Sequence, residues 1–258
     1  SNALAAPSSG IVEVFDYGRN KPGLMPLWVG EGDLPTPAFI AEAASRSLEA
    51  GETFYTYQAG IPSLRETIAQ YLSQMYAQPV SAGRISVTSG GMHALQIAAT
   101  LTASTGDEVI VPSFTFVSTA NAFALRGAKP VFIDVKEEDF NLDETLLEKL
   151  ITPRTKAVVP VHYAGVGCEM SAIEEICRAH NIAIVEDNAH GLFGHYRGRP
   201  LGSFGQMATQ SFHETKAPSV KFPGIDIELS RVLHASEAIY TAAPTPPSGT
   251  GRAVTKFT

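Results

Sequence analysis

Five short apolar runs, separated by four segments whose apolar residues have helical spacing, constrain the fold of this chain most strongly. The runs lie at 85–88, 109–112, 130–135, 157–161 and 182–186, and the helical segments lie near 92–103, 117–126, 143–151 and 170–180. Strands that alternate with helices in this way form parallel sheets, because each helix returns the chain to the edge where the next strand starts. The sequence therefore predicts a three-layer α/β/α fold whose mostly parallel sheet is covered by helices on both faces.

The residues before these units have a different composition. Residues 11–40 are rich in Gly and Pro, and the stretch 28–37 is typical of an extended arm. Helical spacing of apolar residues appears at 38–50 and again at 61–76, where Pro62 suits a first helical turn. We therefore expect an N-terminal arm over residues 1–40, followed by a large domain over residues 41–216.

The residues after position 216 break the alternation. We expect a strand at 225–230 and a short helix near 229–240. The stretch 242–251 is dominated by Pro, Gly and small polar residues, which bury too little apolar surface to pack. Residues 217–258 are therefore predicted to form an atypical, partly disordered tail.

The bulk properties exclude several classes of partner. A chain of 258 residues with 44% hydrophobic residues can fill a core, and its formal net charge of −7 offers no electrostatic footprint for nucleic acid or for an anionic membrane. No apolar run reaches the roughly 20 residues needed to span a bilayer. The cysteines number two and the seven histidines lack ligand spacing, so we expect no disulfide framework, no metal site and a cytoplasmic location.

Two residues predict a cofactor. Asp187 directly follows the apolar run at 182–186, and Lys216 lies 29 residues further along the chain. A partly desolvated lysine amine can form an imine with the aldehyde of pyridoxal phosphate, and a carboxylate beside the pyridine nitrogen keeps that ring protonated. An acid at a strand end and a solvated lysine are each common, so it is their order and context that favour a pyridoxal phosphate site.

Residues near the ends of two other predicted strands could complete this site. Ser89, Gly90 and Gly91 stand between a strand and a helix, where free backbone N–H groups can bind a phosphate, although the same sequence also serves as an ordinary turn and cap. Phe116 follows the next strand and could stack on a flat heterocycle, with core packing as the alternative.

Three polar residues are weaker candidates. Ser211 lies five residues before Lys216, so that its hydroxyl could reach a phosphate while the amine reaches the aldehyde. His162 and His190 each follow a predicted strand and could hydrogen bond to a ligand, including a substrate in the case of His162. For a single histidine, however, a structural role is the more common one.

Four segments of the chain resemble a known family. They lie at 112–122, 160–165, 186–187 and 211–216, and they are similar to segments of the sugar-nucleotide aminotransferases of the DegT/DnrJ/EryC1 family, especially those that aminate the 4-keto carbon of dTDP-4-keto-6-deoxyglucose. This resemblance covers about residues 106–216. It implies a pyridoxal-phosphate-dependent transferase of fold type I.

The resemblance also implies a role for each residue of the site. Lys216 would form the internal aldimine and Asp187 would pair with the pyridine nitrogen. Ser211 would contact the phosphate, and Phe116 would stack on the ring. His190 would lie near the phenolic oxygen of the cofactor, where many relatives have Gln.

The first part of the chain, residues 11–105, is more similar to class I aspartate-type aminotransferases. The similar segments are 28–37, 54–66 and 87–96. In that group the position of Gly30 lies near the substrate carboxylate, and the position of Tyr55 reaches the phosphate bound by the partner subunit. The chain therefore resembles a hybrid joined near residues 106–113, and the shared site implies a homodimer.

The chain departs from both groups in two ways. After Lys216 it continues with Ala217 and Pro218, where the sugar enzymes have Asn and a Gly-rich turn. Family members also continue into a small C-terminal domain that closes the site, and we find no counterpart of that domain in this sequence.

The leading interpretation is a pyridoxal-phosphate-dependent aminotransferase that moves an amino group from an amino acid, glutamate by resemblance, to a keto sugar nucleotide. Two alternatives stay open: a class I enzyme that acts on a keto acid, and an aminotransferase-like protein that folds without turnover. A nucleotide-binding dehydrogenase is disfavoured, because residues 165–167 lack the third glycine and the following acid of a dinucleotide fingerprint.

Overall fold

A computed structural model of the chain describes residues 10–25, 35–211 and 237–240. The chain divides into two units, Ser1–Pro35 and Thr36–Thr258. In the first unit, helix α1 spans Gly10–Gly18, within the predicted N-terminal arm and before the stretch 28–37 that is typical of an extended segment. The Gly and Pro residues that suggested the arm are concentrated after position 18, whereas Ile11, Val14 and Phe15 have helical spacing.

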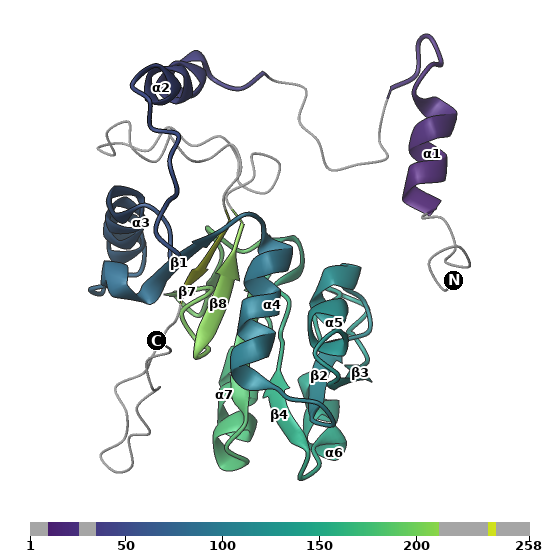
Figure 1. Cartoon of the computed structure of the whole chain (residues 1–258). Coiled ribbons are helices and arrows are strands. Elements are labelled where there is room, and N and C mark those ends of the chain that lie inside the picture. Colours follow the sequence, from purple (N-terminus) through teal and green to yellow (C-terminus); the bar gives the residue numbers. More distant parts are fainter. Residues whose placement is uncertain (1–9, 26–34, 212–236, 241–258) are drawn as a thin grey trace. The chain divides into compact units, whose positions relative to one another are not determined.

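The second unit is built around a seven-stranded sheet in the order β1-β9-β8-β5-β4-β2-β3 (Figure 1). The five apolar runs of the sequence are all strands, with slightly different ends. The strands are β1 (Ile85–Thr88), β2 (Glu108–Pro112), β3 (Lys129–Ile133), β4 (Thr155–Val158), β5 (Ala183–Asn188), β8 (Met207–Gln210) and β9 (Glu237–Tyr240).

Strand β9 is the antiparallel member of this sheet. It pairs in opposite direction with both β1 and β8, while β3, β2, β4, β5 and β8 pair in parallel. The helix predicted near residues 229–240 is therefore wrong for Glu237–Tyr240, which completes the sheet between two strands that are far apart in sequence. The strand predicted at 225–230 lies outside the described residues.

Most of the predicted helices are present, with small differences in their bounds. Pro62 occupies the first turn of α3, as its fixed backbone angle favours, and the region predicted as one helix at 143–151 is a 3-10 turn followed by a short helix. The remaining helices are α2 (Ala38–Glu49), α3 (Pro62–Met75), α4 (Gly91–Thr102), α5 (Val117–Ala124), α6 (Leu147–Leu150), α7 (Met170–Ala179), η1 (Ala82–Arg84), η2 (Glu144–Leu146) and η3 (Tyr163–Gly165). A two-stranded hairpin, β6 (His195–Tyr196) with β7 (Arg199–Pro200), was not predicted.

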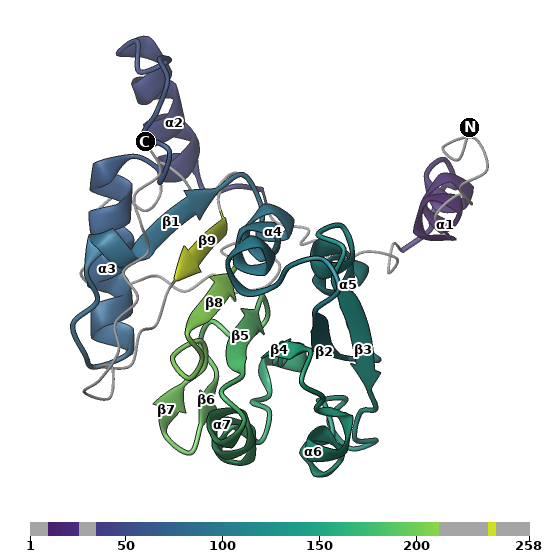
Figure 2. The same ribbon diagram turned by 60° about the horizontal axis from the view of Figure 1, so that its bottom comes forward.

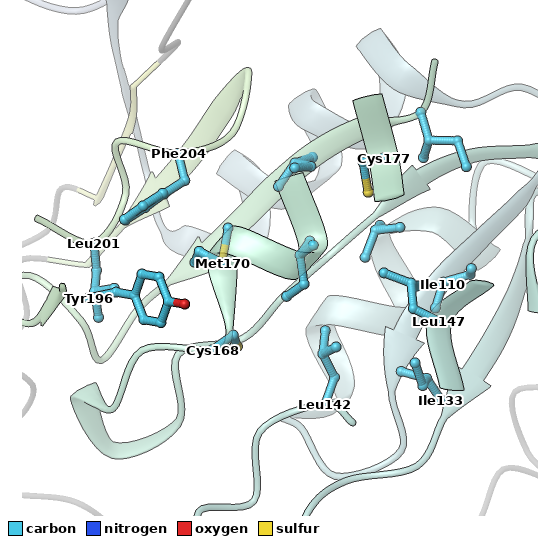
Figure 3. Packing of buried hydrophobic residues seen from close by; sticks show 14 residues of the cluster. Ile110, Ile133, Leu142, Leu147, Cys168, Met170, Cys177, Tyr196, Leu201 and Phe204 are labelled. Atoms are coloured by element: carbon cyan, nitrogen blue, oxygen red, sulfur yellow. The ribbon is translucent and has the colours of Figure 1, made fainter. Parts of the chain in front are cut away.

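Side-chain alternation along the strands assigns the helices to the two faces. Val109 and Val111 of β2 pack in a core with Leu95 of α4 and Phe123 of α5. The intervening residue, Ile110, joins the opposite core. That second core contains Leu147 of α6 and three residues of α7, and Figure 3 shows Met170 and Cys177 among them. Because successive side chains of a strand point to opposite faces, α4 and α5 cover one face and α6 and α7 cover the other, as Figure 2 also shows.

The predicted three-layer α/β/α architecture is confirmed. A third core, built on Leu64, Ile68 and Leu72 of α3, packs against Ile85 of β1. Both cysteines are buried free thiols. Among the described residues, no helix is long and apolar enough to cross a membrane.

Candidate active site

Four of the predicted site segments meet at one edge of the sheet. The loop with Ser89 and Gly90 links β1 to α4, and Phe116 is the last residue before α5. Asp187 is the penultimate residue of strand β5, and Ser211 directly follows β8. The strands that carry these loops run parallel, so their carboxyl ends share the edge where open α/β sheets bind ligands.

The carboxylate of Asp187 is fixed on the face covered by α4 and α5. The hydroxyl of Thr119, in α5, donates to Oδ2 over 2.7 Å, and the backbone N–H of Ala189 donates to Oδ1 over 3.3 Å. Thr119 is buried and Ala189 is half-buried, and the Thr119 hydroxyl also lies 3.1 Å from the Thr115 hydroxyl. A buried carboxylate with two donors still has lone pairs for a further N–H, such as that of a protonated pyridine.

The N-terminus of α4 is open. At Gly90, which precedes the helix, an added Cβ would meet no atom within 4 Å among the described residues. The first N–H groups of a 12-residue helix lack partners within the helix, and the helix dipole favours an anion there. An uncrowded glycine at this position fits a bound phosphate. Together with the Asp187 carboxylate, it fits pyridoxal phosphate.

The remaining cofactor candidates differ in exposure. Phe116 is largely exposed, so it is available for stacking and does not pack in the core. His190 is also exposed, and its Nδ1 accepts from the backbone N–H of Ala164 over 3.3 Å. Ser211 is buried two residues beyond Thr209, which is opposite Asp187 in the β5–β8 pair.

His162 is buried completely, which contradicts its predicted contact with a substrate. Its Nε2 lies 2.9 Å from the carboxylate of Glu186, also fully buried, and its Nδ1 lies 3.3 Å from the backbone nitrogen of Cys168. Burial alone would lower the pKa of His162, but the side chains of Cys168 and Glu186 outweigh this effect and raise the pKa to about 10. This histidine has a structural role.

Glu186 holds the turn that leads into β8. Its Oε1 accepts from the backbone N–H groups of Phe204 and Gly205, over 2.7 and 2.6 Å, and its Oε2 accepts from that of Gly202 over 2.8 Å. With His162, four donors therefore satisfy one buried carboxylate. Because Glu186 precedes Asp187 on the strand, the two acids point to opposite faces, one towards the turn and one towards the ligand edge.

Polar side chains continue this network next to the turn. The Asn188 amide donates to Gln210 over 2.8 Å, and the Gln210 amide donates to the Tyr76 hydroxyl over 2.8 Å. Gly202 lies against all three, with φ +83°, and a Cβ there would lie 2.7 Å from the Asn188 amide nitrogen. Only glycine fits a backbone that is both left-handed and this crowded.

Three predicted site residues are not brought to the edge by the described structure. Lys216 and Gly30 lie outside the described residues. Tyr55, between α2 and α3, is fully exposed, and its neighbours Phe54 and Tyr57 are largely exposed.

The roles of Thr119 and Glu186 were not predicted from the sequence. Thr119 interrupts the otherwise apolar buried positions of α5, and a polar residue at such a position can indicate a buried partner. Glu186 ends an apolar run, where a charge can be buried only if it is well paired. Neither signal names the partner, because both partners lie far away in sequence.

Comparison with known proteins agrees with this geometry. A protein-family model described as the DegT/DnrJ/EryC1/StrS aminotransferase family matches residues 42–220. GDP-perosamine synthase of Caulobacter vibrioides is 50% identical over 111 residues, which are 43% of this chain and 30% of that protein. The family match includes much of the region predicted to resemble class I enzymes, and that second resemblance stays a prediction.

Solved structures match over more of the chain. One match is the structure of DesV from S. venezuelae in complex with a ketimine intermediate. The aligned region covers 92% of this chain and 54% of the DesV chain, with a TM-score of 0.62 and 28% sequence identity. Another match is the PLP-form of a putative sugar aminotransferase, Spr1654 from Streptococcus pneumoniae. The aligned region covers 82% of this chain and 52% of the Spr1654 chain, with a TM-score of 0.64 and 25% sequence identity. The chain spans less than a third of the curated relative and about half of each of these structures.

These matches support pyridoxal phosphate as the cofactor and fold type I as the fold. Because the family match extends over more than half of the sequence and includes Asp187 and the loops around it, this chain belongs to the DegT/DnrJ/EryC1/StrS aminotransferase family.

Proposed function

We propose that this chain carries the cofactor-binding part of an aminotransferase that moves an amino group from an amino acid, glutamate in our proposal, to a keto sugar nucleotide. The observation that carries the proposal is the buried Asp187 carboxylate, which Thr119 orients towards the ligand edge of the sheet. The sugar-nucleotide acceptor rests on the family and on GDP-perosamine synthase as a relative.

Asp187 keeps a proton on the ring nitrogen of the cofactor. Pyridoxal phosphate supplies an electron sink when bound, and the sink is strongest while that nitrogen is charged. The Thr119 hydroxyl and the Ala189 N–H hold the carboxylate in place and stabilise its ionised form. The protein thus arranges the charge before a substrate arrives.

Other residues bind and orient the group. The N-terminus of α4, with Gly90, and the Ser211 hydroxyl bind the phosphate, while Phe116 covers one face of the ring. His190 hydrogen bonds to the phenolic oxygen. The Lys216 amine holds the cofactor and, once released, moves the proton at the reacting carbon of the substrate as general acid and base.

We further propose that two chains share each site. Tyr55 is fully exposed beside Phe54 and Tyr57, and three exposed aromatic residues in one short segment are typical of a surface that another chain covers. In this arrangement Tyr55 contacts the phosphate bound by the partner subunit.

Spectroscopy tests the proposal directly. The chain mixed with pyridoxal phosphate should gain the visible absorbance that the cofactor acquires on bonding to a lysine amine, and Lys216→Ala should lose it. Asp187→Asn should lower the rate of conversion of the cofactor by glutamate by about 100-fold or more, since it removes the charge that protonates the ring. Asp134→Asn is the matched control, because this exposed acid also follows a strand, β3, of the same sheet.

The outcomes separate the three interpretations. A chain that stays colourless with added cofactor contradicts the proposal. A coloured chain that glutamate leaves unconverted is an aminotransferase-like protein without turnover. Conversion that is completed by a keto acid and not by a keto sugar nucleotide supports the class I alternative.

A further inference from the structure

Two threonine hydroxyls form a chain that ends on the carboxylate of Asp187. Thr115 lies in the loop after β2, and Thr119 lies in the first turn of α5. The Thr119 hydroxyl donates to Oδ2 of Asp187 over 2.7 Å, and its oxygen lies 3.1 Å from the hydroxyl oxygen of Thr115. Thr119 and Asp187 are buried, whereas Thr115 is half-buried. This hydroxyl chain therefore leads from a partly exposed loop to the buried acid.

The chemistry of the three groups gives the hydroxyl chain a direction. An ionised carboxylate can only accept, so Thr119 gives its single proton to Asp187. The Thr119 oxygen must then accept in its contact with Thr115, and the Thr115 hydroxyl is the donor. Hydrogen bonds in such a directed series polarise one another and strengthen by about 10–30% per bond. A hydroxyl that does not touch Asp187 therefore strengthens the bond that does.

The hydroxyl chain also encloses Phe116, which precedes α5. Phe116 follows Thr115 directly in sequence, and the backbone N–H of Thr119 donates to its carbonyl over 3.1 Å. A phenylalanine side chain cannot accept a bond from the first N–H groups of a helix, so it is a poor residue for this position. Its largely exposed ring explains its presence better. The same two threonines thus hold the loop of the proposed stacking residue and the acid.

We propose that Thr115 is a positioning residue of the cofactor site, which acts through Thr119 to orient the Asp187 carboxylate and to keep it ionised. The inference rests on the proposed role of Asp187 in keeping a proton on the ring nitrogen. Thr115 needs no contact with the cofactor for this effect, because it strengthens the donor that Asp187 accepts from. It also couples the loop of Phe116 to the acid.

Substitutions that remove or keep the hydroxyl test this inference. Thr115→Val preserves the shape of the side chain and removes the hydroxyl, so it should raise the dissociation constant of pyridoxal phosphate by about 2- to 10-fold, the effect of one neutral hydrogen bond. Thr115→Ser keeps the hydroxyl and should bind the cofactor as the wild type does. Thr102→Val is the matched control, because half-buried Thr102 donates to the Ala98 carbonyl over 2.8 Å at the other end of α4. Absorbance titration measures all four proteins.

The protonation of the ring nitrogen distinguishes positioning from a merely structural role. In pyridoxal phosphate labelled with ¹⁵N, the chemical shift of the ring nitrogen reports whether it carries a proton. Thr115→Val should move this resonance towards the unprotonated value, and Thr115→Ser should leave it in place. A weaker affinity with an unmoved resonance means that Thr115 only supports the loop, and it overturns the inference.

A double-mutant cycle tests whether Thr115 acts through Thr119. In a Thr119→Val background, Thr115→Val should change neither the dissociation constant nor the resonance any further, and additive losses would overturn the inference. Asp187→Asn separates this inference from the proposed function. A wild-type resonance in Asp187→Asn refutes the proposed role of the acid, whereas a resonance that moves in Asp187→Asn and not in Thr115→Val refutes only the role of Thr115.

Discussion

The buried carboxylate of Glu186 should be the largest single polar contribution to the stability of this sheet, and Glu186→Gln measures it. The substitution preserves shape but replaces one acceptor oxygen by an NH₂ donor. If the amide oxygen keeps the Oε1 position and its bonds with Phe204 and Gly205, the N–H of Gly202 and the Nε2 of His162 face a donor instead of an acceptor.

Each buried donor without an acceptor costs about 1–3 kcal/mol, so two of them cost roughly 2–6 kcal/mol. Removing one partner of a buried ion pair costs about 3–5 kcal/mol, which agrees with that range. We therefore expect the free energy of unfolding to fall by about 3–5 kcal/mol, a large part of the roughly 5–15 kcal/mol of a whole domain.

Urea unfolding followed by far-UV circular dichroism provides the assay. Glu174→Gln is the control, because Glu174 forms a partly exposed ion pair with Arg199 at 3.1 Å, and such pairs contribute at most about 1 kcal/mol. A loss for Glu186→Gln no larger than that of the control would refute the assignment of Glu186 as the residue that holds the turn.

The contact between Glu186 and His162 should also make stability depend on pH. The pKa of His162 is raised from 6.5 to about 10 in the folded chain, so its contribution is complete below pH 6.5 and is lost as the pH rises towards 10. The wild type should therefore lose stability over this interval. In Glu186→Gln that loss should be much smaller, and an unchanged slope would contradict the pairing.

Three further predictions follow from single contacts. Thr119→Val should lower the free energy of unfolding by about 1–3 kcal/mol and weaken binding of pyridoxal phosphate, because Asp187 loses its hydroxyl donor; denaturation and absorbance titrations measure the two effects. Gly202→Ala should lower the free energy of unfolding by more than about 2 kcal/mol, because the new Cβ would be crowded. Gly198→Ala is the control: its φ of +80° is similar, but a Cβ there would meet no atom within 4 Å, so it should cost only the roughly 1–2 kcal/mol of a left-handed backbone. Equal melting temperatures of the two variants would contradict the crowding at Gly202. Burial raises the pKa of Cys177 from 9.0 to about 12, so the stability that it contributes is present below pH 9 and lost as the pH rises towards 12; Cys177→Ala should flatten that part of a stability–pH curve.

Local pattern was sufficient for most elements of the large domain, although not for the β6–β7 hairpin. The runs at 109–112, 157–161 and 182–186, which correspond to β2, β4 and β5, are largely buried and almost wholly apolar, and this signal does not depend on distant parts of the chain. The position of Asp187 at a strand end followed from the same pattern, because parallel strands place their carboxyl ends together.

Pairing between distant segments could not be predicted in this way. Residues Glu237–Tyr240 have a composition that allows a helix, and they form a strand because β1 and β8 present unpaired edges on either side. For a similar reason, the sequence could not predict whether the His162 side chain is buried. From sequence it could face a ligand or the interior, and only the approach of Glu186 from the neighbouring strand decided for the interior.

By itself, the sequence determined the layered fold, the cofactor and the strand ends at which the cofactor residues stand, because periodicity and motif order are local properties that survive without coordinates. The tertiary structure alone decided which acid faces the ligand and which holds the turn, and that Thr119 orients Asp187. These features depend on contacts between residues far apart in the chain, and such contacts exist only once the sheet has brought its strand ends together.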